Sequence, residues 1–342
     1  MADSLIPKPT TNSLLRLGIA SQTPLAVAYS GGADSTALLL MLARQHPGRV
    51  HAIHIHHGLQ AAADDFAEHC KAFCEALGVP LHVVFVDAKP ATGQSPEDAA
   101  RKARYAALSG KVLQLNNVFA RQKPAQLAIK VIAIAQHADD QVETLLLALS
   151  RGAGLPGLSS MPASWQRDGV EFVRPLLGMT SIEIRAWLAE HGLIARHPYS
   201  ANLGQGWVED STNADTQFTR NRIRHDLIPA LEKTFPQFQQ TFARSAAHAA
   251  EAQSLLWQVA IEDIARTGNP PRITALQNLT PLRRGNVLRY WLKASHQASP
   301  STAQLAELQS QIVNCTDRSK QLHMKIANGY IKRNGEMLVF LP

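Results

Sequence analysis

Short apolar segments alternate with longer segments of helical periodicity in the first half of the chain. The apolar segments predict four buried strands, because each is short and bounded by polar, glycine or proline residues; they lie at residues 25–29, 50–57, 81–86 and 127–135. Residues 35–44 and 64–77 carry the helical pattern. Strands separated by helices are joined by right-handed crossovers, which produce a parallel sheet. We therefore expect an α/β fold with a Rossmann-like parallel sheet that binds ligands at the carboxyl ends of its strands.

The pattern changes after about residue 228. Long helical segments follow at residues 238–264 and 281–295, and Asn328-Gly329 and Asn334-Gly335 are hairpin turn signals near the end. Residues 110–126 are less regular, and we expect a helix end followed by a surface insertion there. The pattern predicts two domains: an α/β domain at residues 1–228, and a smaller, mainly helical domain at residues 229–342 that ends in short β-hairpins.

The composition is typical of a globular protein with a sizeable core, since 45% of the 342 residues are hydrophobic and 18% are charged. Lys and Arg outnumber Asp and Glu by 34 to 27, which permits a polyanionic partner without requiring one. No apolar run approaches the roughly 20 residues that span a membrane, and no signal peptide is recognisable. Three cysteines do not suggest a disulfide framework. We expect a cytoplasmic protein with no membrane partner.

A glycine-containing turn follows the first predicted strand, where the chain reads Ser30-Gly31-Gly32-Ala33-Asp34-Ser35. The glycines allow positive φ and close approach of the backbone to a phosphate, and the amides that begin the next helix favour an anion. Ser30 and Ser35 add hydroxyl donors, and Asp34 is a candidate ligand for a magnesium ion bound to the phosphates. The spacing is neither a Walker A motif nor a dinucleotide fingerprint. A plain strand-to-helix turn with a serine cap is the alternative.

Histidines end the second predicted strand in the string His54-Ile55-His56-His57-Gly58-Leu59. Because side chains alternate along a strand, His54 and His56 share one face and His57 takes the other. These histidines could contact adenine or phosphate, or could be solvated.

Two groups of arginines carry positive charge. Arg101 and Arg104 lie one helical turn apart on one face, where they could bind pyrophosphate or RNA phosphate. Arg220, Arg222 and Arg224 cannot share a single helix face, so they predict a spread of positive charge. For both groups the alternative is a solvated basic surface, and contact with RNA or nucleotide is the functional interpretation.

Two acids lie near the start of the helix after the fourth predicted strand, in the string Gln136-His137-Ala138-Asp139-Asp140-Gln141-Val142-Glu143-Thr144. Asp140 and Glu143 are three residues apart, so their carboxylates share a face near the strand ends. Two acids there could hold a cationic amine, bind magnesium or accept a proton. Alternatively, Asp139 or Asp140 only caps the helix, although a cap does not need Glu143.

These strings resemble a known superfamily. The loop at residues 30–35 is similar to the signature of the N-type ATP pyrophosphatases, or PP-loop superfamily, whose members split ATP between the α and β phosphates and typically transfer AMP to a substrate oxygen. The other strings resemble, in family order, elements of the tRNA(Ile)-lysidine synthetases: HxxHGL at residues 54–59, ARxxRY at 100–105, RGxGxxGL at 151–158, EDx[ST]N at 209–213 and RNxxR at 220–224. The resemblance covers about residues 26–231.

The resemblance implies a PP-loop ATPase domain that uses ATP and Mg2+. It implies transfer of AMP to the 2-carbonyl oxygen of the wobble cytidine in tRNA(Ile) with a CAU anticodon, followed by attack of free L-lysine on carbon 2. This modification changes codon reading from AUG to AUA and identity from methionine to isoleucine. The resemblance leaves a homodimer open.

Site roles follow from the residues and the resemblance together. Nucleotide contacts are expected from Ser30, Gly31, Gly32, Ala33, Asp34, Ser35 and His56. Substrate contacts are expected from Arg101, Arg104, Asp140, Glu143, Arg220, Arg222 and Arg224. Catalytic roles are expected for Asp34, Arg104, Asp140 and Glu143, with Asp140 favoured over Glu143 as the base.

Two departures and three alternatives remain at this point. Gln136 stands where many relatives have a second histidine, and longer members continue into another C-terminal domain. Cys70 and Cys74 lie on the apolar stripe of the helix at residues 64–77, so we expect them to pack in the core. PP-loop tRNA thiolases usually show paired working cysteines, which disfavours that alternative. The others are a small-molecule PP-loop amidotransferase and a non-catalytic RNA-binding protein.

Overall fold

The computed structural model of the protein describes residues 19–20, 22–56, 63–86, 96–122, 128–196, 206–209, 215–315, 322–327 and 329–342. The chain forms two compact units. Unit 1 comprises Met1–Ala153 and Ser160–Ser245, and unit 2 comprises Gly154–Ser159 and Ala246–Pro342. Helix α10 (Phe238–Thr267) runs from one unit into the other, so the expected domain boundary at residue 228 stays a prediction.

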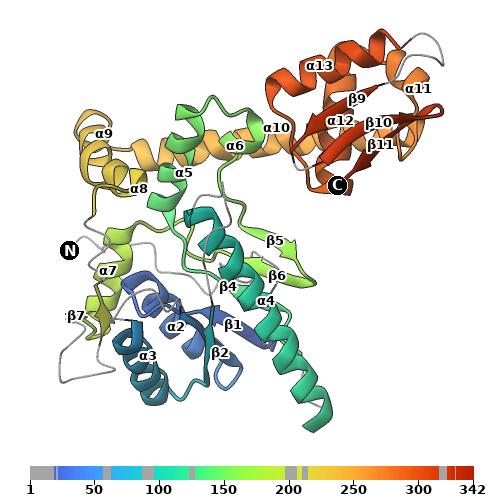
Figure 1. The fold of residues 1–342 in the computed structure, drawn as a ribbon. Helices are drawn as coiled ribbons and strands as arrows, with labels where there is room; N and C mark the ends of the chain where they lie inside the picture. Colours follow the sequence, from blue (N-terminus) through green and yellow to red (C-terminus); the bar gives the residue numbers. More distant parts are fainter. Residues whose placement is uncertain are drawn as a thin grey trace. The chain divides into compact units, whose positions relative to one another are not determined.

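A six-stranded sheet in the order β3-β2-β1-β4-β6-β5 lies at the centre of unit 1 (Figure 1). Its strands are β1 (Leu25–Ala28), β2 (Val50–His56), β3 (Leu81–Phe85), β4 (Val131–Ala133), β5 (Ser164–Arg167) and β6 (Val170–Val173). All pairs are parallel except β5 with β6. The predicted parallel α/β fold is therefore confirmed, with β4 shorter than expected. Chain order reverses between β1 and β4, and such a switch point opens a crevice at the carboxyl ends of the strands.

The β5–β6 hairpin was not expected from the apolar pattern. Its turn is Asp168-Gly169, with φ of 51° and 75° at these two residues. An Asp-Gly pair is a strong hairpin signal because both central residues of the turn need positive φ. The hairpin adds β6 beside β4 and brings the next residue, Arg174, to the carboxyl edge of the sheet.

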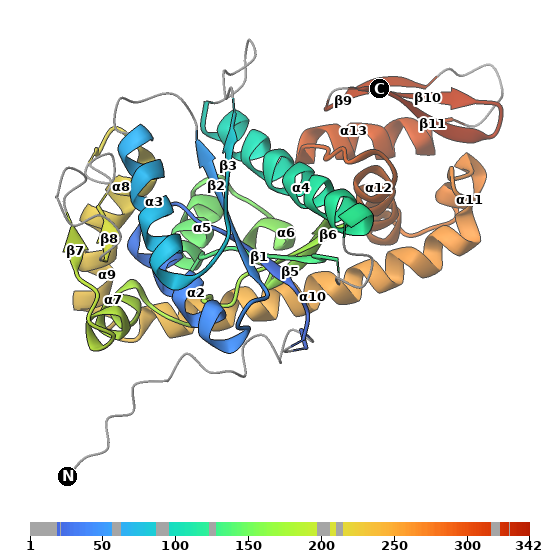
Figure 2. The same ribbon diagram turned by 90° about the horizontal axis from the view of Figure 1, so that it is seen from below.

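Helices cover both faces of the sheet. One face carries α2 (Ala33–Gln45), α3 (Ala63–Leu77) and α7 (Ser181–Glu190), which share a core with alternate residues of β1. The opposite face carries α4 (Pro96–Gln122), and Figure 2 shows α3 and α4 on opposite sides of β2 and β3. Cys70 and Cys74 are buried in the first core, as predicted. Each large apolar side chain buried in these layers contributes about 1.5–3 kcal/mol.

Helix α4 corrects the expected irregular stretch over residues 110–122, whereas residues 123–126 of the expected insertion lie outside the described residues. It continues without interruption to Gln122, because Leu108, Val112 and Leu115 extend its apolar stripe and are buried against the sheet. Gly110 is exposed and does not end the helix. The amide of Asn116 also bonds both the N–H and the carbonyl of Ile129, each at 2.8 Å.

The remaining elements of unit 1 lie after β4. They are α5 (Ala138–Ser150), β7 (Ala195–Arg196), β8 (Trp207–Val208), α8 (Thr219–Arg222), a π-helical turn η2 (Ile223–Leu227) and α9 (Ile228–Thr234). The short β7–β8 pair adjoins the glycine turn after β1, because the Val208 N–H donates to the Gly31 carbonyl at 2.9 Å.

Unit 2 combines helices with a small antiparallel sheet. The helices are α6 (Leu155–Leu158), α11 (Ile273–Gln277), α12 (Pro281–His296) and α13 (Thr302–Val313), and the strands β9 (His323–Ile326), β10 (Gly329–Asn334) and β11 (Met337–Leu341) are ordered β11-β10-β9. The predicted long helices and the hairpin at Asn334-Gly335 are confirmed, whereas Asn328 lies outside the described residues. No helix in the described ranges is long and apolar enough to cross a membrane.

Candidate active site

The turn between β1 and α2 leaves backbone amides available for an anion. Gly31 has φ of 88°, and a Cβ there would lie 3.1 Å from the Cys70 Sγ, so this position requires glycine. Gly32 is the N-cap of α2 and makes no side-chain cap bond, so the expected serine cap is absent from this helix, which is described throughout. The Ser30 and Ser35 hydroxyls lie 3.0 Å apart and brace the turn. The amides that begin α2 therefore face the carboxyl edge of the sheet with the geometry that suits phosphate.

His137 is at the centre of a group of carboxylates that sequence analysis did not identify. Its Nε2 lies 3.6 Å from both Asp34 Oδ2 and Asp140 Oδ2, and its Nδ1 lies 3.5 Å from Asp139 Oδ2. Burial alone would lower the pKa of the imidazole, but the hydrogen bond with Asp34 and the charges of Asp140, Asp34 and Asp139 raise it to about 9. The ring is thus a buried cation at neutral pH.

His137 also begins α5. Its own backbone N–H donates to Asp140 Oδ2 at 3.0 Å, and its Nδ1 lies 3.3 Å from the Asp139 N–H. Nδ1 accepts that bond, and so completes a reciprocal capping box, only when the ring is neutral. The interpretation of Asp139 or Asp140 as the N-cap is therefore wrong, because His137 occupies that position. A histidine N-cap has no strong sequence signal, although the position of His137 two residues before a pair of aspartates could be read from the sequence.

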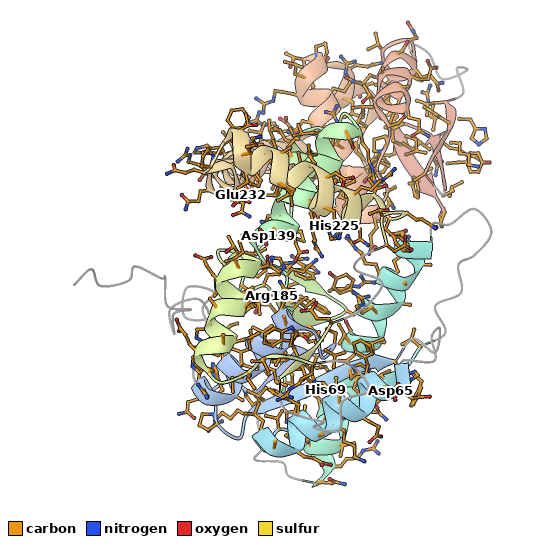
Figure 3. All side chains as sticks on the ribbon, turned by 90° about the vertical axis from the view of Figure 1, so that its left-hand side faces the viewer. Asp65, His69, Asp139, Arg185, His225 and Glu232 are labelled. Atoms are coloured by element: carbon orange, nitrogen blue, oxygen red, sulfur yellow. The ribbon has the colours of Figure 1, made fainter. Side chains whose placement is uncertain are left out.

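Asp139 fixes the surrounding helices. Its two carboxylate oxygens accept from the Ser181 N–H at 2.8 Å and from the Gln239 amide at 2.5 Å. In Figure 3 it lies between Arg185 of α7 and the helical segment that carries His225 and Glu232. Since both oxygens are engaged, Asp139 ties α7 and the start of α10 to α5.

Asp140 and Glu143 share a face, as predicted, and the structure adds Arg224 to them. The Arg224 guanidinium donates to Glu143 Oε1 at 2.7 and 2.9 Å, and its Nη2 lies 3.7 Å from Asp140 Oδ1. Glu143 is fully buried, and burial raises its pKa even though Arg224 opposes the shift. Its second oxygen, Oε2, has no hydrogen-bond partner among the described residues.

The three predicted arginines after β8 separate. Arg224 lies on the π-helical turn η2 and faces the acids, and a π-turn often marks a functional position. Arg222 is exposed and donates to the Thr219 hydroxyl at 3.1 Å. Arg220 is half-buried, and its charge lowers the pKa of Glu143.

Asp34 fits a cation ligand. Burial opposes its ionisation, but the hydrogen bond and charge of His137, with Arg185 and Arg224, lower its pKa overall. Its Oδ1 has no hydrogen-bond partner within the described ranges. Those ranges contain no group of three or more His, Cys, Asp or Glu side chains that could hold a metal ion. Asp34 would therefore supply one carboxylate oxygen to Mg2+, and phosphate oxygens would complete the coordination.

His56, Arg101 and Arg104 do not join this carboxylate group. The buried His56 ring bonds Asp64 Oδ1 at 3.0 Å and lies 4.7 Å from the Phe85 ring, beside a cavity of about 630 Å³ along α3 and β3. The rest of its string, residues 57–59, lies outside the described residues. Arg101 and Arg104 are exposed on one face of α4, as the spacing predicted.

The assembled site has a surplus of negative charge next to an anion-binding turn. Four carboxylates, those of Asp34, Asp139, Asp140 and Glu143, lie around the imidazole of His137 and the guanidinium of Arg224. Among the described residues, the charges of Arg185 and Arg220 also act on Asp34 and Glu143. Such a site can hold a phosphate on the turn and one or more cations on the acids.

Comparisons with known proteins agree with this geometry. A family model of the PP-loop domain matches residues 8–231, and a model of the TilS substrate binding domain matches residues 272–338. The chain is similar in fold to the U34-tRNA thiolase NcsA from Methanococcus maripaludis with its [4Fe-4S] cluster, at a TM-score of 0.52 and 18% identity, over 72% of this chain and 78% of that one. That likeness concerns the fold alone.

Sequence relatives are closer. The chain is 53% identical to the tRNA(Ile)-lysidine synthase of Polaromonas naphthalenivorans, over 94% of this chain and 90% of that protein. It is 42% identical to the synthase of Pseudomonas fluorescens over 78% of this chain, but it spans only 57% of that relative. With the synthase of Enterobacter sp. it shares 36% identity over 92% of this chain and 69% of the relative. The chain belongs to the tRNA(Ile)-lysidine synthase family.

Proposed function

We propose that this chain is a ligase that joins free L-lysine to carbon 2 of the wobble cytidine in CAU-anticodon tRNA(Ile). The reaction consumes ATP, passes through an adenylated cytidine and releases pyrophosphate and AMP. The observation that supports it best is the carboxylate group of Asp34, Asp140 and Glu143 beside the uncapped start of α2. The phosphates of ATP would bind at the start of α2, and the lysine amine would bind at the neighbouring carboxylates.

Adenylation is the first step that the site would serve. The cytidine 2-carbonyl is a poor electrophile, and its oxygen leaves only after it has received AMP. The amides of Gly32 to Ser35 and the hydroxyls of Ser30 and Ser35 would hold the phosphates, and Asp34 would hold Mg2+, which offsets their charge. Arg104 would stabilise the charge that develops as pyrophosphate leaves.

Lysine transfer is the second step. The lysine ammonium would bind to Asp140 and to the unpartnered Oε2 of Glu143, while Arg224 holds Oε1. Lysine must lose a proton before its ε-nitrogen attacks carbon 2, and Asp140, which is only half-buried, is our proposed base. A new C–N bond forms as the C–O bond to AMP breaks, so AMP carries away the former carbonyl oxygen.

The exposed arginines would serve the RNA. Arg101, Arg222 and Arg104 present positive charge on unit 1, and Arg220 adds a half-buried cation near Glu143. Phosphate contacts of this kind give affinity that falls with salt and carry no sequence information.

The test is incubation of CAU-anticodon tRNA with ATP, Mg2+ and labelled lysine. We expect label in the tRNA only when ATP is present, and none when the wobble cytidine is replaced by uridine. Asp34→Ala in folded protein should abolish the transfer. Absence of label with folded wild-type protein would contradict the proposal, and mass spectrometry showing added sulfur would favour the thiolase alternative.

A further inference from the structure

Gln136 and Arg174 form a polar pair at the carboxyl edge of the sheet, between β4 and β6. These strands run parallel with Ala133 opposite Val173, and the Ile134 N–H donates to the Val173 carbonyl at 2.9 Å. Arg174 follows β6 directly, and Gln136 immediately precedes His137. The pair therefore adjoins the carboxylate group, and none of the roles proposed above uses it.

Arg174 is a buried cation whose hydrogen-bond and ring contacts are all neutral, while the charge of Asp140 acts on it from beyond ion-pair distance. Only 6% of its surface is exposed. Its Nε donates to Gln136 Oε1 at 2.5 Å, its Nη1 donates to the Pro162 carbonyl at 2.6 Å, and its Cζ lies 3.8 Å from the centre of the Trp165 ring. Within the described ranges no carboxylate lies at ion-pair distance from it. Burying a charge without a counter-ion in contact is costly, so stability alone does not account for a guanidinium here.

The surroundings hold Arg174 in one place. Trp165 stacks on Phe172 with centroids 5.0 Å apart, and Tyr105 meets both rings edge-on at 5.7 and 5.4 Å. The guanidinium lies over the Trp165 ring of this cluster. A cation fixed in this way presents its Nε–H to Gln136 in a single direction.

This contact sets the orientation of the Gln136 amide. A guanidinium has donors and no acceptor, so only the amide oxygen of Gln136 can face Arg174. The amide NH2 must then point away from Arg174. Gln136 is half-buried, and its NH2 has no hydrogen-bond partner among the described residues.

We propose that Gln136, held by the positioning residue Arg174, donates its amide N–H to a substrate oxygen at the carboxyl ends of β4 and β6. The acceptor is a phosphoryl oxygen of ATP or the carbonyl oxygen of the cytidine, two sources of the same oxygen-acceptor chemistry. The identity of the substrate rests on the proposed function. The direction of the Gln136 N–H donor rests on the contact with Arg174.

The test is Gln136→Glu, which keeps an acceptor for Arg174 and removes the donor. Its matched control is Gln114→Glu on the exposed side of α4. There the amide oxygen also accepts from a cation, Lys111, at 3.1 Å, and the site lies about 15 Å along the helix from Arg104. Equilibrium binding of ATP and of CAU-anticodon tRNA is measured separately, together with the KM for each and the rate of lysine transfer.

We expect Gln136→Glu to weaken binding of one ligand by roughly 10- to 100-fold, because a donor is lost and a negative charge is added. A raised Kd for ATP identifies a phosphoryl oxygen, and a raised Kd for tRNA alone identifies the cytidine. The Tm should not fall, since the new carboxylate gives Arg174 a counter-ion. Gln136→His, which offers one donor and one acceptor, should recover most of the binding, and Gln114→Glu should stay within about twofold of wild type.

Binding of both ligands by Gln136→Glu within about twofold of wild type would overturn the inference. Failure of the proposed function is a different result: wild-type protein would bind ATP and tRNA but transfer no lysine. The assignment of Gln136 would then still be decided by the two binding constants.

Discussion

Each unit has a buried carboxylate that pairs with an arginine from another helix. The two pairs differ in how many of the carboxylate oxygens are hydrogen-bonded. Glu143 in unit 1 and Asp263 in unit 2 are both fully buried, and their partners Arg224 and Arg283 are 39% and 40% exposed. Arg283 donates to both oxygens of Asp263, at 2.6 and 2.8 Å. Arg224 donates twice to the same oxygen of Glu143 and leaves the other without a partner in the described residues.

The difference separates a structural ion pair from a binding site. Asp263 is satisfied, and its bidentate pair anchors α12 to α10. Glu143 retains a buried oxygen that has no partner among the described residues, and such a group costs about 1–3 kcal/mol. Next to it are Asp140 and His137, so the unused acceptor belongs to a group that can take a cation.

The largest expected effect is on lysine transfer. Glu143→Gln and Asp140→Asn should each reduce the rate by about 100-fold or more, because each removes a charge that binds the ammonium or accepts its proton. The measurement is single-turnover transfer of labelled lysine to CAU-anticodon tRNA. Full activity in both folded variants would refute our assignment of these acids.

A pH titration distinguishes the two carboxylates, because the His137 imidazole lies among the acids next to Glu143. The ion-pair partners of Asp263 in the described residues are arginines. The pKa of His137 is raised to about 9, so its stabilising contribution is complete below about pH 6.5 and is lost as pH rises through 9. The loss should approach about 3 kcal/mol in the metal-free protein. Chemical denaturation between pH 6 and 10 measures it. His137→Asn should flatten this dependence and Asp263→Asn should not; an unchanged slope in His137→Asn would contradict the account.

Substitution of Asp263 should lower the stability of the protein and leave the rate of lysine transfer nearly unchanged. Asp263→Asn removes two charge-assisted hydrogen bonds, and since Arg283 is partly exposed we expect a loss of about 2 kcal/mol. Thermal unfolding would show a lower Tm. Lysine transfer by the folded fraction should stay within about threefold of wild type, and a 100-fold loss there would remove the distinction between the two pairs.

The smallest effect is expected from the cysteines. Burial raises the pKa of the Cys70 thiol well above its usual value and that of Cys74 to about 12, so both remain protonated. Cys70→Ala and Cys74→Ala should each cost about 1 kcal/mol of stability and change turnover by less than twofold. Loss of lysine transfer in either well-folded variant would instead support sulfur chemistry at the site.

Local signals predicted much of the fold. The short apolar strands and the glycine turn at residues 30–35 were identified because periodicity and turn chemistry act within a few residues. The continuation of α4 past Gly110 was missed because burial of Val112 and Leu115 against the sheet outweighs one unfavourable residue. The β5–β6 hairpin was missed although Asp168-Gly169 was a usable signal.

The candidate site was less predictable. The spacing of Asp140 and Glu143 correctly placed both on one face, but nothing local pairs Glu143 with Arg224, which is 81 residues away. Arg224 was grouped with Arg220 and Arg222 as a spread of charge, and the π-turn η2 instead directs it to the acids. His137 escaped notice because its importance depends on Asp34, which arrives from another strand end.

The most direct test of the central claim separates the two half-reactions in Glu143→Gln. Labelled AMP from α-labelled ATP and labelled lysine are followed into CAU-anticodon tRNA in parallel reactions. We expect the variant still to transfer AMP and to accumulate adenylated tRNA, while lysine transfer is lost. Transfer of lysine at the wild-type rate, or loss of AMP transfer together with lysine transfer in folded protein, would contradict the assignment of Glu143 to lysine.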